Sequence, residues 1–292
     1  MKIQYIDRQT GKLKTETPPG DFFLKLLYHH PFGKTALLPV VKQKFLSSWY
    51  GKLMNKPSSV KKIRGFVKKF NINMDEAEKP LEDYTSFNDF FFRKLKRGAR
   101  SIKNGLISPG DGKILAFENI NDIDYFYVKG RSFMLKEFLA SKTLAIKYQN
   151  ASLIILRLAP NDYHRYHFPY SGTAFATTEI KGNYLSVSPY ALANNFAKVF
   201  CENKRKYIIL STLKKGDILI TLVGASMVGS IVNTYIANSE VKKGDEMGYF
   251  AFGGSSVVLL IDKDKFTVEA DLIQNTKNKI ETFVKMGDCI AR

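Results

Sequence analysis

The sequence predicts an α+β protein in which a helical N-terminal region packs on a β-rich core of barrel-like or sandwich-like character. Over the first hundred residues, apolar side chains recur at helical spacing. From about residue 105 onward, short apolar runs alternate with Gly, Asn, Asp and Lys, the pattern of strands and turns. With 292 residues, of which 45% are apolar, the chain is long enough to bury a large core. We therefore expect two parts, residues 1–103 and residues 104–292.

Charge separates the same two parts. Residues 1–103 contain 22 Lys or Arg against 9 Asp or Glu, whereas residues 104–292 contain 23 against 18, and the whole chain carries a net charge of +18. A concentrated positive field favours an anionic partner, either nucleic acid or an acidic membrane surface. The N-terminal part has no zinc-ligand spacing and no aromatic motif for single-stranded nucleic acid, so we predict a membrane surface and no nucleic acid.

The N-terminal elements follow in order. Residues 1–17 alternate polar and apolar side chains, which indicates a short strand pair or a loosely held arm. Asp21 is a candidate N-cap for a helix that ends near Pro31, and a second helix is expected from near Thr35 to Met54.

A third helix is expected from Val60 to Phe70, capped by Ser58 or Ser59. Five basic side chains share this helix with an apolar stripe, and a basic amphipathic helix is typical of a segment on an anionic bilayer. The alternative is an ordinary surface helix docked on the core. A fourth helix is expected after a cap at Thr85 or Ser86, with Phe87, Phe90 and Phe91 on its apolar face and Gly98 ending the segment.

The core is expected to contain many short strands. Candidates are residues 113–117, 125–129, 153–158, 207–210, 218–223, 227–232, 256–262 and 267–272. Residues 218–239 carry no charge, but glycines and asparagines interrupt them, so we interpret them as two buried strands and predict no transmembrane helix. The first residues lack the apolar core of a signal peptide. Cys201 and Cys289 form no metal or redox spacing and fit a reducing compartment.

Three segments carry candidate chemistry. In Gly253-Gly-Ser-Ser256, the glycines leave the Gly254 carbonyl uncovered beside the hydroxyl of Ser255, as an intramolecular acyl shift requires. The segment Ser108-Pro-Gly-Asp-Gly112 contains Asp111, and Ala159-Pro-Asn-Asp-Tyr-His-Arg-Tyr-His-Phe-Pro169 contains His164 and His167. Taken singly, each segment also fits a plain turn or polar loop. Together, Asp, His and Ser are the parts of an activated nucleophile.

The same segments resemble the three signatures of the phosphatidylserine decarboxylases. Two further stretches, Ser86-Phe-Asn-Asp-Phe-Phe-Phe-Arg-Lys-Leu-Lys96 and Val128-Lys-Gly-Arg-Ser-Phe133, are similar to other parts of that family, and order and spacing agree from about residue 84 to the end. Two departures are visible, since Gly253 stands where many members have Leu and Ser256 where many have Thr. Neither changes the Gly254–Ser255 pair.

The resemblance implies a proenzyme that cleaves itself between Gly254 and Ser255 into 1–254 and 255–292. In this interpretation His167, oriented by Asp111, takes the proton from Ser255, which attacks the Gly254 carbonyl, and β-elimination and hydrolysis leave a covalent pyruvoyl group at position 255. That group would form a Schiff base with phosphatidylserine, and decarboxylation would give phosphatidylethanolamine. The resemblance also implies that His164 contacts the substrate carboxylate or assists decarboxylation, that His167 is a candidate proton donor to the new carbanion, and that no metal is required.

The implied partners are an anionic phospholipid and its membrane surface. The two cleavage fragments would stay associated, and a homodimer is left open. We expect peripheral attachment at the cytoplasmic face of a membrane. Three alternatives remain. The first is a pyruvoyl-dependent decarboxylase of a soluble, amino-acid-like substrate, and the second is a non-enzymatic β-barrel or carrier-like domain in which the chain would stay whole. The third is a non-enzymatic membrane-surface or nucleic-acid binding protein.

Overall fold

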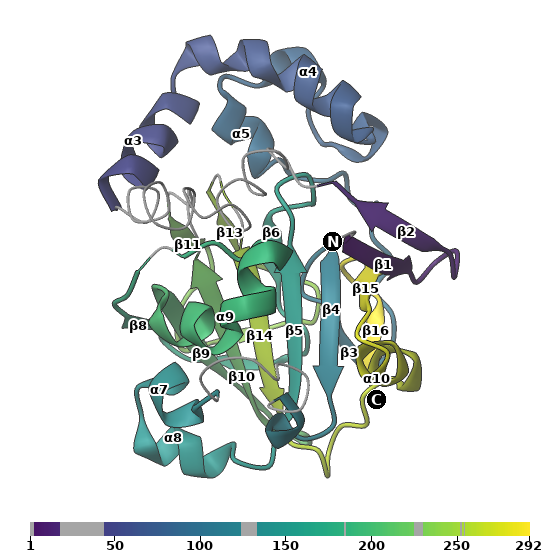
Figure 1. The fold of residues 1–292 in the computed structure, drawn as a ribbon, viewed down its shortest axis with the longest axis vertical. Helices are drawn as coiled ribbons and strands as arrows, with labels where there is room; N and C mark the ends of the chain where they lie inside the picture. The colour runs from purple at the N-terminus through teal and green to yellow at the C-terminus, as the bar shows by residue number, and fades with distance from the viewer. Residues whose placement is uncertain are drawn as a thin grey trace.

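A computed structural model describes residues 3–17, 44–123, 133–183, 185–224, 230–251, 253 and 255–292. The chain is an α+β protein, as predicted, and it is richer in strands than in helices (Figure 1). Several predicted features lie outside the described residues: the helix after Asp21, the part of the second helix before residue 44, the strand at 125–129, the start of the strand at 227–232 and the carbonyl of Gly254.

One large sheet forms the centre of the molecule. Its strands are β12 (Ser239–Val241), β7 (Gly172–Ala174), β9 (Arg205–Thr212), β10 (Gly216–Gly224), β14 (Ser255–Ile261), β5 (Ser152–Leu158), β4 (Gly112–Phe117), β15 (Glu281–Val284), β1 (Ile3–Asp7) and β2 (Leu13–Glu16), in that spatial order, with β8 (Thr178–Ile180) also on β9. Every pairing is antiparallel except that of β1 with β15.

The expected barrel-like closure is not formed by the described strands. A closed sheet requires its two end strands to hydrogen bond each other, but β12 and β2 lie at opposite ends of the strand order. Apolar clusters on the two sides of the open sheet are instead covered by helices and by a second, smaller sheet. The core is therefore layered.

Alternate residues of the central strand β14 face opposite layers, as a pleated strand requires. Val257 and Leu259 belong to a cluster that includes Leu272 of α10 (Ala270–Lys277) and Phe250 of the second sheet. The opposite face packs against α7 (Leu135–Leu139) and α9 (Pro189–Glu202), and Figure 1 shows α9 lying across this face of the sheet. Burial on both faces explains why this strand reads as an unbroken apolar run.

Two small sheets and several short helices complete the core. The second sheet orders its strands β11 (Ile231–Asn233), β13 (Glu246–Phe250) and β6 (Arg165–His167), and a third pairs β16 (Cys289–Ala291) with β3 (Leu106–Ile107). The described core also contains α8 (Lys142–Lys147) and a 3₁₀ turn at Ile120–Asp122. Further 3₁₀ turns lie before residue 103, at Pro57–Val60, Met74–Glu76 and Leu81–Asp83.

Of the two alternatives for residues 1–17, a strand pair or a loosely held arm, the structure shows the strand pair, and it belongs to the main sheet. β1 pairs with β2 and, in parallel, with β15. The buried guanidinium of Arg157 ties the hairpin to the core, because it donates hydrogen bonds to both carboxylate oxygens of Glu16 and also binds Glu281. The hairpin therefore lies on the core side of the boundary that we placed at residue 103.

Three helices, α3 (Lys44–Met54), α4 (Lys61–Phe70) and α5 (Phe87–Phe91), gather at one end of the long axis in Figure 1. They share a buried apolar cluster of Met54, Ile63, Tyr84, Phe87, Phe90 and Phe91. The predicted cap of α5 is confirmed, since Ser86 accepts a hydrogen bond from the Asp89 backbone. The predicted cap of α4 is wrong: Val60 holds that position, and Ser59 instead accepts a hydrogen bond from the Phe87 backbone.

Two other expectations are resolved. Residues 267–272 are not a strand, because Glu269 N-caps helix α10 and only Val268 makes an isolated bridge, to Ala291. Residues 218–239 contain β10 and β11, which agrees with two strands. Across the described ranges, no helix has the length and apolar content needed to cross a membrane.

Candidate active site

The structure brings the three candidate motifs together at one end of the central strands. Ser255, the first residue of β14, pairs with Leu158, the last residue of β5. The Leu158 side chain packs beside Gly110 of the aspartate motif, since a Cβ built on Gly110 would lie 3.8 Å from it. The backbone N–H of His167 donates to the carbonyl of Pro109 at 2.8 Å. Segments more than 140 residues apart in sequence thus share one site.

Ser255 is fully buried, and within the described part of the chain its Oγ has no hydrogen-bond partner. Its side chain faces the same layer as Val257, because residues two apart in a strand point the same way. That layer contains Tyr166 and Phe250, on the two strands β6 and β13 next to the histidine motif. Gly253 has φ of 137°, a conformation that L side chains rarely adopt, so a glycine turn leads into the strand.

The hydrogen bonds of His167 assign its tautomer. Nδ1 lies 2.9 Å from the carbonyl oxygen of Gly244, which only accepts, so Nδ1 carries the proton. Nε2 is then an acceptor, and the hydroxyl of Tyr163 donates to it at 3.0 Å. Burial lowers the pKa of His167, so the ring is neutral near pH 7. Nε2 of the neutral ring therefore has a lone pair, which accepts one hydrogen bond, from the hydroxyl of Tyr163.

His164 has the opposite tautomer. Nε2 donates to the carbonyl of Ala159 at 3.1 Å, and Nδ1 is a buried acceptor with no partner among the described residues. Its ring stacks on Phe91 of α5, with centroids 3.9 Å apart. Complete burial, helped by the charge of Arg93, lowers the pKa of His164 to about 3. Because the His164 ring is neutral and Nδ1 bears a lone pair, Nδ1 can accept a hydrogen bond from a bound donor group.

Asp111 is buried and accepts three hydrogen bonds. Arg100 donates two, at 3.0 and 2.6 Å, and the Met286 backbone donates one at 2.8 Å. Its negative charge acts on His167 through space, as one of the influences that oppose the burial-lowered pKa. Both ring nitrogens of His167 have other hydrogen-bond partners, so the structure brings Asp111 near His167 without a direct bond between them.

The other polar residues of the histidine motif have structural partners. Asp162 forms a buried ion pair with Lys113 and accepts from the Ala159 backbone. Arg165 donates to the Phe92 carbonyl and pairs with Glu246. These contacts of Asp162 and Arg165 hold the segment that carries His164 and His167 against the rest of the protein.

Sequence reasoning missed several neighbours of the site. Tyr163 stands inside the motif, but no local pattern shows that its hydroxyl turns to His167. Gly244 and Arg100 lie 77 and 11 residues from their partners His167 and Asp111. Arg93 is 7% exposed, and its charge reaches His164. A buried arginine leaves no periodic signal, since Lys94, Lys96 and Arg97 nearby are exposed.

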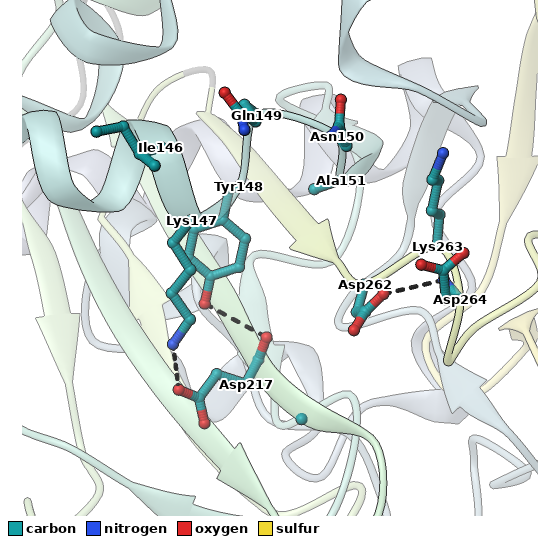
Figure 2. Close-up of a pocket in the computed structure, with 11 residues that line it drawn as sticks. Ile146, Lys147, Tyr148, Gln149, Asn150, Ala151, Asp217, Asp262, Lys263 and Asp264 are labelled. Carbon is teal, nitrogen blue, oxygen red and sulfur yellow. Dashed lines mark hydrogen bonds and ion pairs between the residues drawn. The ribbon is translucent and has the colours of Figure 1, made fainter.

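Among the described residues, no group of three or more His, Cys, Asp or Glu side chains is arranged to hold a metal ion. A separate pocket, drawn in Figure 2, is lined by residues 146–151, Gly216, Asp217 and residues 262–264. These residues adjoin the start of β10 and β5 and the end of β14, at the far ends of the strands that carry Ser255 and Leu158. Six residues of strand separate the two ends by about 20 Å, so this pocket is distinct from the site.

Comparison with known proteins agrees with the geometry. A profile of the phosphatidylserine decarboxylase family matches residues 87–292. The chain is 54% identical over 290 residues to a phosphatidylserine decarboxylase proenzyme of Fusobacterium nucleatum, covering 98% of this chain and 96% of that protein. Proteins of the same name from Clostridium tetani and Desulfitobacterium hafniense are 45% and 44% identical, and each alignment covers at least 97% of both chains. The chain therefore belongs to the phosphatidylserine decarboxylase family of carboxy-lyases.

Proposed function

We propose that this chain is a self-cleaving proenzyme whose mature form decarboxylates phosphatidylserine to phosphatidylethanolamine. The observation that carries the proposal is the placement of Ser255. Its hydroxyl is buried, has no partner among the described residues, and lies at the strand end where the aspartate and histidine motifs meet. Relatives that align over nearly the whole chain are named as proenzymes of this decarboxylase.

Self-cleavage uses groups of the chain itself. The Ser255 hydroxyl attacks the carbonyl carbon of Gly254, and the peptide nitrogen leaves as the free amine of residue 255, giving an ester. β-Elimination then removes the Cα proton of residue 255 and breaks its Cβ–Oγ bond, so that residues 1–254 are released with a carboxylate end that includes the former Ser255 Oγ. The dehydroalanine left at position 255 takes up water and loses ammonia. A hydroxyl with no competing hydrogen bond is free to turn toward the carbonyl.

We assign His167 as the base that removes the Ser255 proton. Its Nε2 bears a lone pair because Nδ1–H is bound to Gly244, and its lowered pKa keeps it unprotonated at neutral pH. The Asp111 carboxylate, held by Arg100, supplies a nearby negative charge that stabilises the imidazolium when it forms. In this assignment Tyr163 must release Nε2 during the reaction.

Conversion of Ser255 to a covalent pyruvoyl group fits two observations: the buried Ser255 Oγ has no described partner, and the histidine motif that meets this end of the sheet carries a second buried polar atom without one, His164 Nδ1. Such a group supplies the electron sink that decarboxylation of an amino acid requires. His164 Nδ1 would accept a hydrogen bond from the substrate amine and help to orient it. The ring of His164 is neutral, so it would not pair with the substrate carboxylate by charge.

The position of β14 supports continued association of the two fragments. β14 lies between β10 and β5, and its backbone pairs with both along its whole length. The short C-terminal fragment also contributes α10, β15 and β16 to the core. A cut before Ser255 would therefore leave the new chain end held within the sheet.

We further propose that helices α3 to α5 form a membrane-facing part, with peripheral attachment at the cytoplasmic face. The basic side chains of α4 at Lys61, Lys62, Lys68 and Lys69 are exposed, and Trp49 on α3 is half exposed. The apolar stripe of α4 packs on α5, so attraction of charge to an anionic surface, rather than deep insertion of this helix, would dominate. A decarboxylase of soluble amino acids would have no use for this surface.

The test is an intact-mass measurement of freshly purified protein beside the Ser255→Ala variant. We expect the wild type to separate into 1–254 and a 255–292 fragment that begins with a ketone in place of the serine amine, whereas the variant stays whole. A wild-type chain that also stays whole would overturn the proposal. Assays with phosphatidylserine and with free serine then separate lipid from soluble substrates.

A further inference from the structure

Arg93 is a buried cation that has no counter-ion among the residues that the structure describes. Its side chain is 7% exposed, yet within the described ranges it forms no ion pair and no side-chain hydrogen bond. Its one close polar contact is with an aromatic face, because Cζ lies 5.0 Å from the centroid of the Phe90 ring. A guanidinium does not lose its proton in a protein, so it cannot avoid the cost of burial by becoming neutral.

Other buried basic groups of the site are matched by acids. Arg100 binds Asp111 and Glu76, Lys113 binds Asp162, and Arg165 binds Glu246. Asp111 is the strongest of the charges acting on Arg93, but its oxygens are occupied by Arg100 and the Met286 backbone. Among the described residues, the positive charge of Arg93 is therefore not matched by an acid beside the site.

Arg93 also stands between the helices and the histidine loop. It directly follows α5, whose Phe91 stacks on the His164 ring, and Phe92 between them accepts a hydrogen bond from Arg165. The titratable groups that feel its charge come from both sides: Tyr84 belongs to the helical cluster, whereas Tyr163 and His164 belong to the site. An anion that reaches His164 from the helical end would meet this guanidinium.

We propose that Arg93 binds an oxyanion of the substrate headgroup, and that this oxyanion is the lipid phosphodiester. The inference rests on the proposed function and adds a binding residue to it. A planar guanidinium matches phosphate and carboxylate oxygens alike. The carboxylate is the group that the reaction removes, and a cation bound to it would stabilise the ground state and slow the loss of carbon dioxide. The phosphodiester keeps its charge from substrate to product, so binding there does not oppose the reaction.

The experiment compares Arg93→Gln, Arg93→Lys and the matched control Arg97→Gln, which changes an exposed arginine four residues away. Intact mass first establishes that each variant has cleaved. Because hydrogen bonds to charged groups are substantial, we expect Arg93→Gln to raise KM for phosphatidylserine about tenfold or more, with a smaller effect on kcat. The KM of Arg93→Lys should lie between those of the wild type and Arg93→Gln, because lysine keeps the charge but lacks the planar guanidinium. The KM of Arg97→Gln should equal that of the wild type.

Inhibition by glycerophosphoethanolamine, which has the phosphodiester and no carboxylate, identifies the oxyanion. We expect Arg93→Gln to raise its inhibition constant by the same factor as KM. A raised KM with an unchanged inhibition constant would assign Arg93 to the carboxylate and overturn the phosphate assignment. A wild-type KM in cleaved Arg93→Gln would overturn the whole inference. A wild-type chain that does not cleave would instead count against the proposed function.

A binding measurement covers the case in which Arg93→Gln does not fold or cleave. The dissociation constant of glycerophosphoethanolamine is measured by calorimetric titration with two uncleaved chains. One carries Ser255→Ala alone, and the other carries Ser255→Ala together with Arg93→Lys. The second chain should bind about tenfold more weakly, because bidentate contact is lost. Equal affinity in the two chains would overturn the inference.

Discussion

The hydroxyl of Tyr163 donates a hydrogen bond to Nε2 of His167 across 3.0 Å, four residues further along the same loop. The nitrogen that would act as the base is thus held by a donor before the reaction begins. A donor on the lone pair disfavours protonation, so it acts in the same direction as burial, which already lowers the pKa of His167.

Replacing Tyr163 with Phe should therefore raise the pKa of His167. Self-cleavage requires the unprotonated ring, so the acidic limb of the cleavage rate should move to higher pH by about half to one unit, the equivalent of one hydrogen bond. The rate is measured by intact mass as a function of pH. A Tyr163→Phe profile that superimposes on the wild type would show that His167 Nε2 does not control the rate.

His164 should make the folded protein sensitive to acid. Its folded pKa, about 3, lies below the ordinary value of 6.5, so the unfolded chain binds the proton more readily. The stabilising contribution is complete above pH 6.5 and is lost as the pH falls toward 3. Between pH 7 and pH 5 the wild type should lose about 2 kcal/mol of unfolding free energy through this group.

Urea denaturation of the uncleaved Ser255→Ala chain, with and without His164→Gln, measures this contribution. The chain with His164→Gln should lose less stability between the two pH values, although His167 continues to contribute in the same direction. Equal losses in the two chains would contradict the assignment of a buried, neutral His164.

Glu16 should anchor the N-terminal hairpin. Burial by itself would raise the pKa of Glu16, but the charges of Arg157 and Lys113, together with the hydrogen bonds from Arg157, lower it to about 2. Glu16→Ala leaves the buried guanidinium with Glu281 alone, and we expect a loss of about 3 kcal/mol in unfolding free energy at pH 7. Glu82→Ala is the matched control, because Glu82 forms an exposed ion pair with Arg64 and should cost less than about 1 kcal/mol. Similar losses in both variants would contradict a buried anchor.

The basic face of α4 should determine attachment to anionic vesicles. Changing Lys61, Lys62, Lys68 and Lys69 together to Gln should weaken binding at least about a hundredfold, since each lysine near the surface contributes about 1 kcal/mol. Lys214, Lys263, Lys277 and Lys279 are exposed outside this helix and provide a control with the same change in charge. Sedimentation with vesicles at low and high salt measures binding. Equal effects of the two sets would assign the attraction to net charge alone.

Local sequence determined the elements that bury a continuous apolar surface. The charge-free run after Ser255 predicts the central strand because only a strand covered on both faces tolerates it, and the run before Ala159 predicts β5 for the same reason. The Ser86 cap and the phenylalanines after it predict α5, since both act within a few residues. Residues 267–272 misled the prediction, because a short alternation of apolar and acidic side chains fits the first turn of a helix as well as a strand.

Tertiary structure alone decided which groups meet. The sequence indicates that His164, His167, Asp111 and Ser255 belong to one chemistry, but their hydrogen bonds depend on residues far along the chain, such as Gly244 for His167 and Met286 for Asp111. The same holds for the parallel pairing of β1 with β15 and for the burial of Arg93. Periodicity shows that a side chain is covered, whereas the covering partner depends on how distant strands and helices pack. The sequence, through its resemblance to the family, therefore suggests the chemistry, whereas the tautomers, the shifted pKa values and the lack of a described ion pair at Arg93 follow only from the fold.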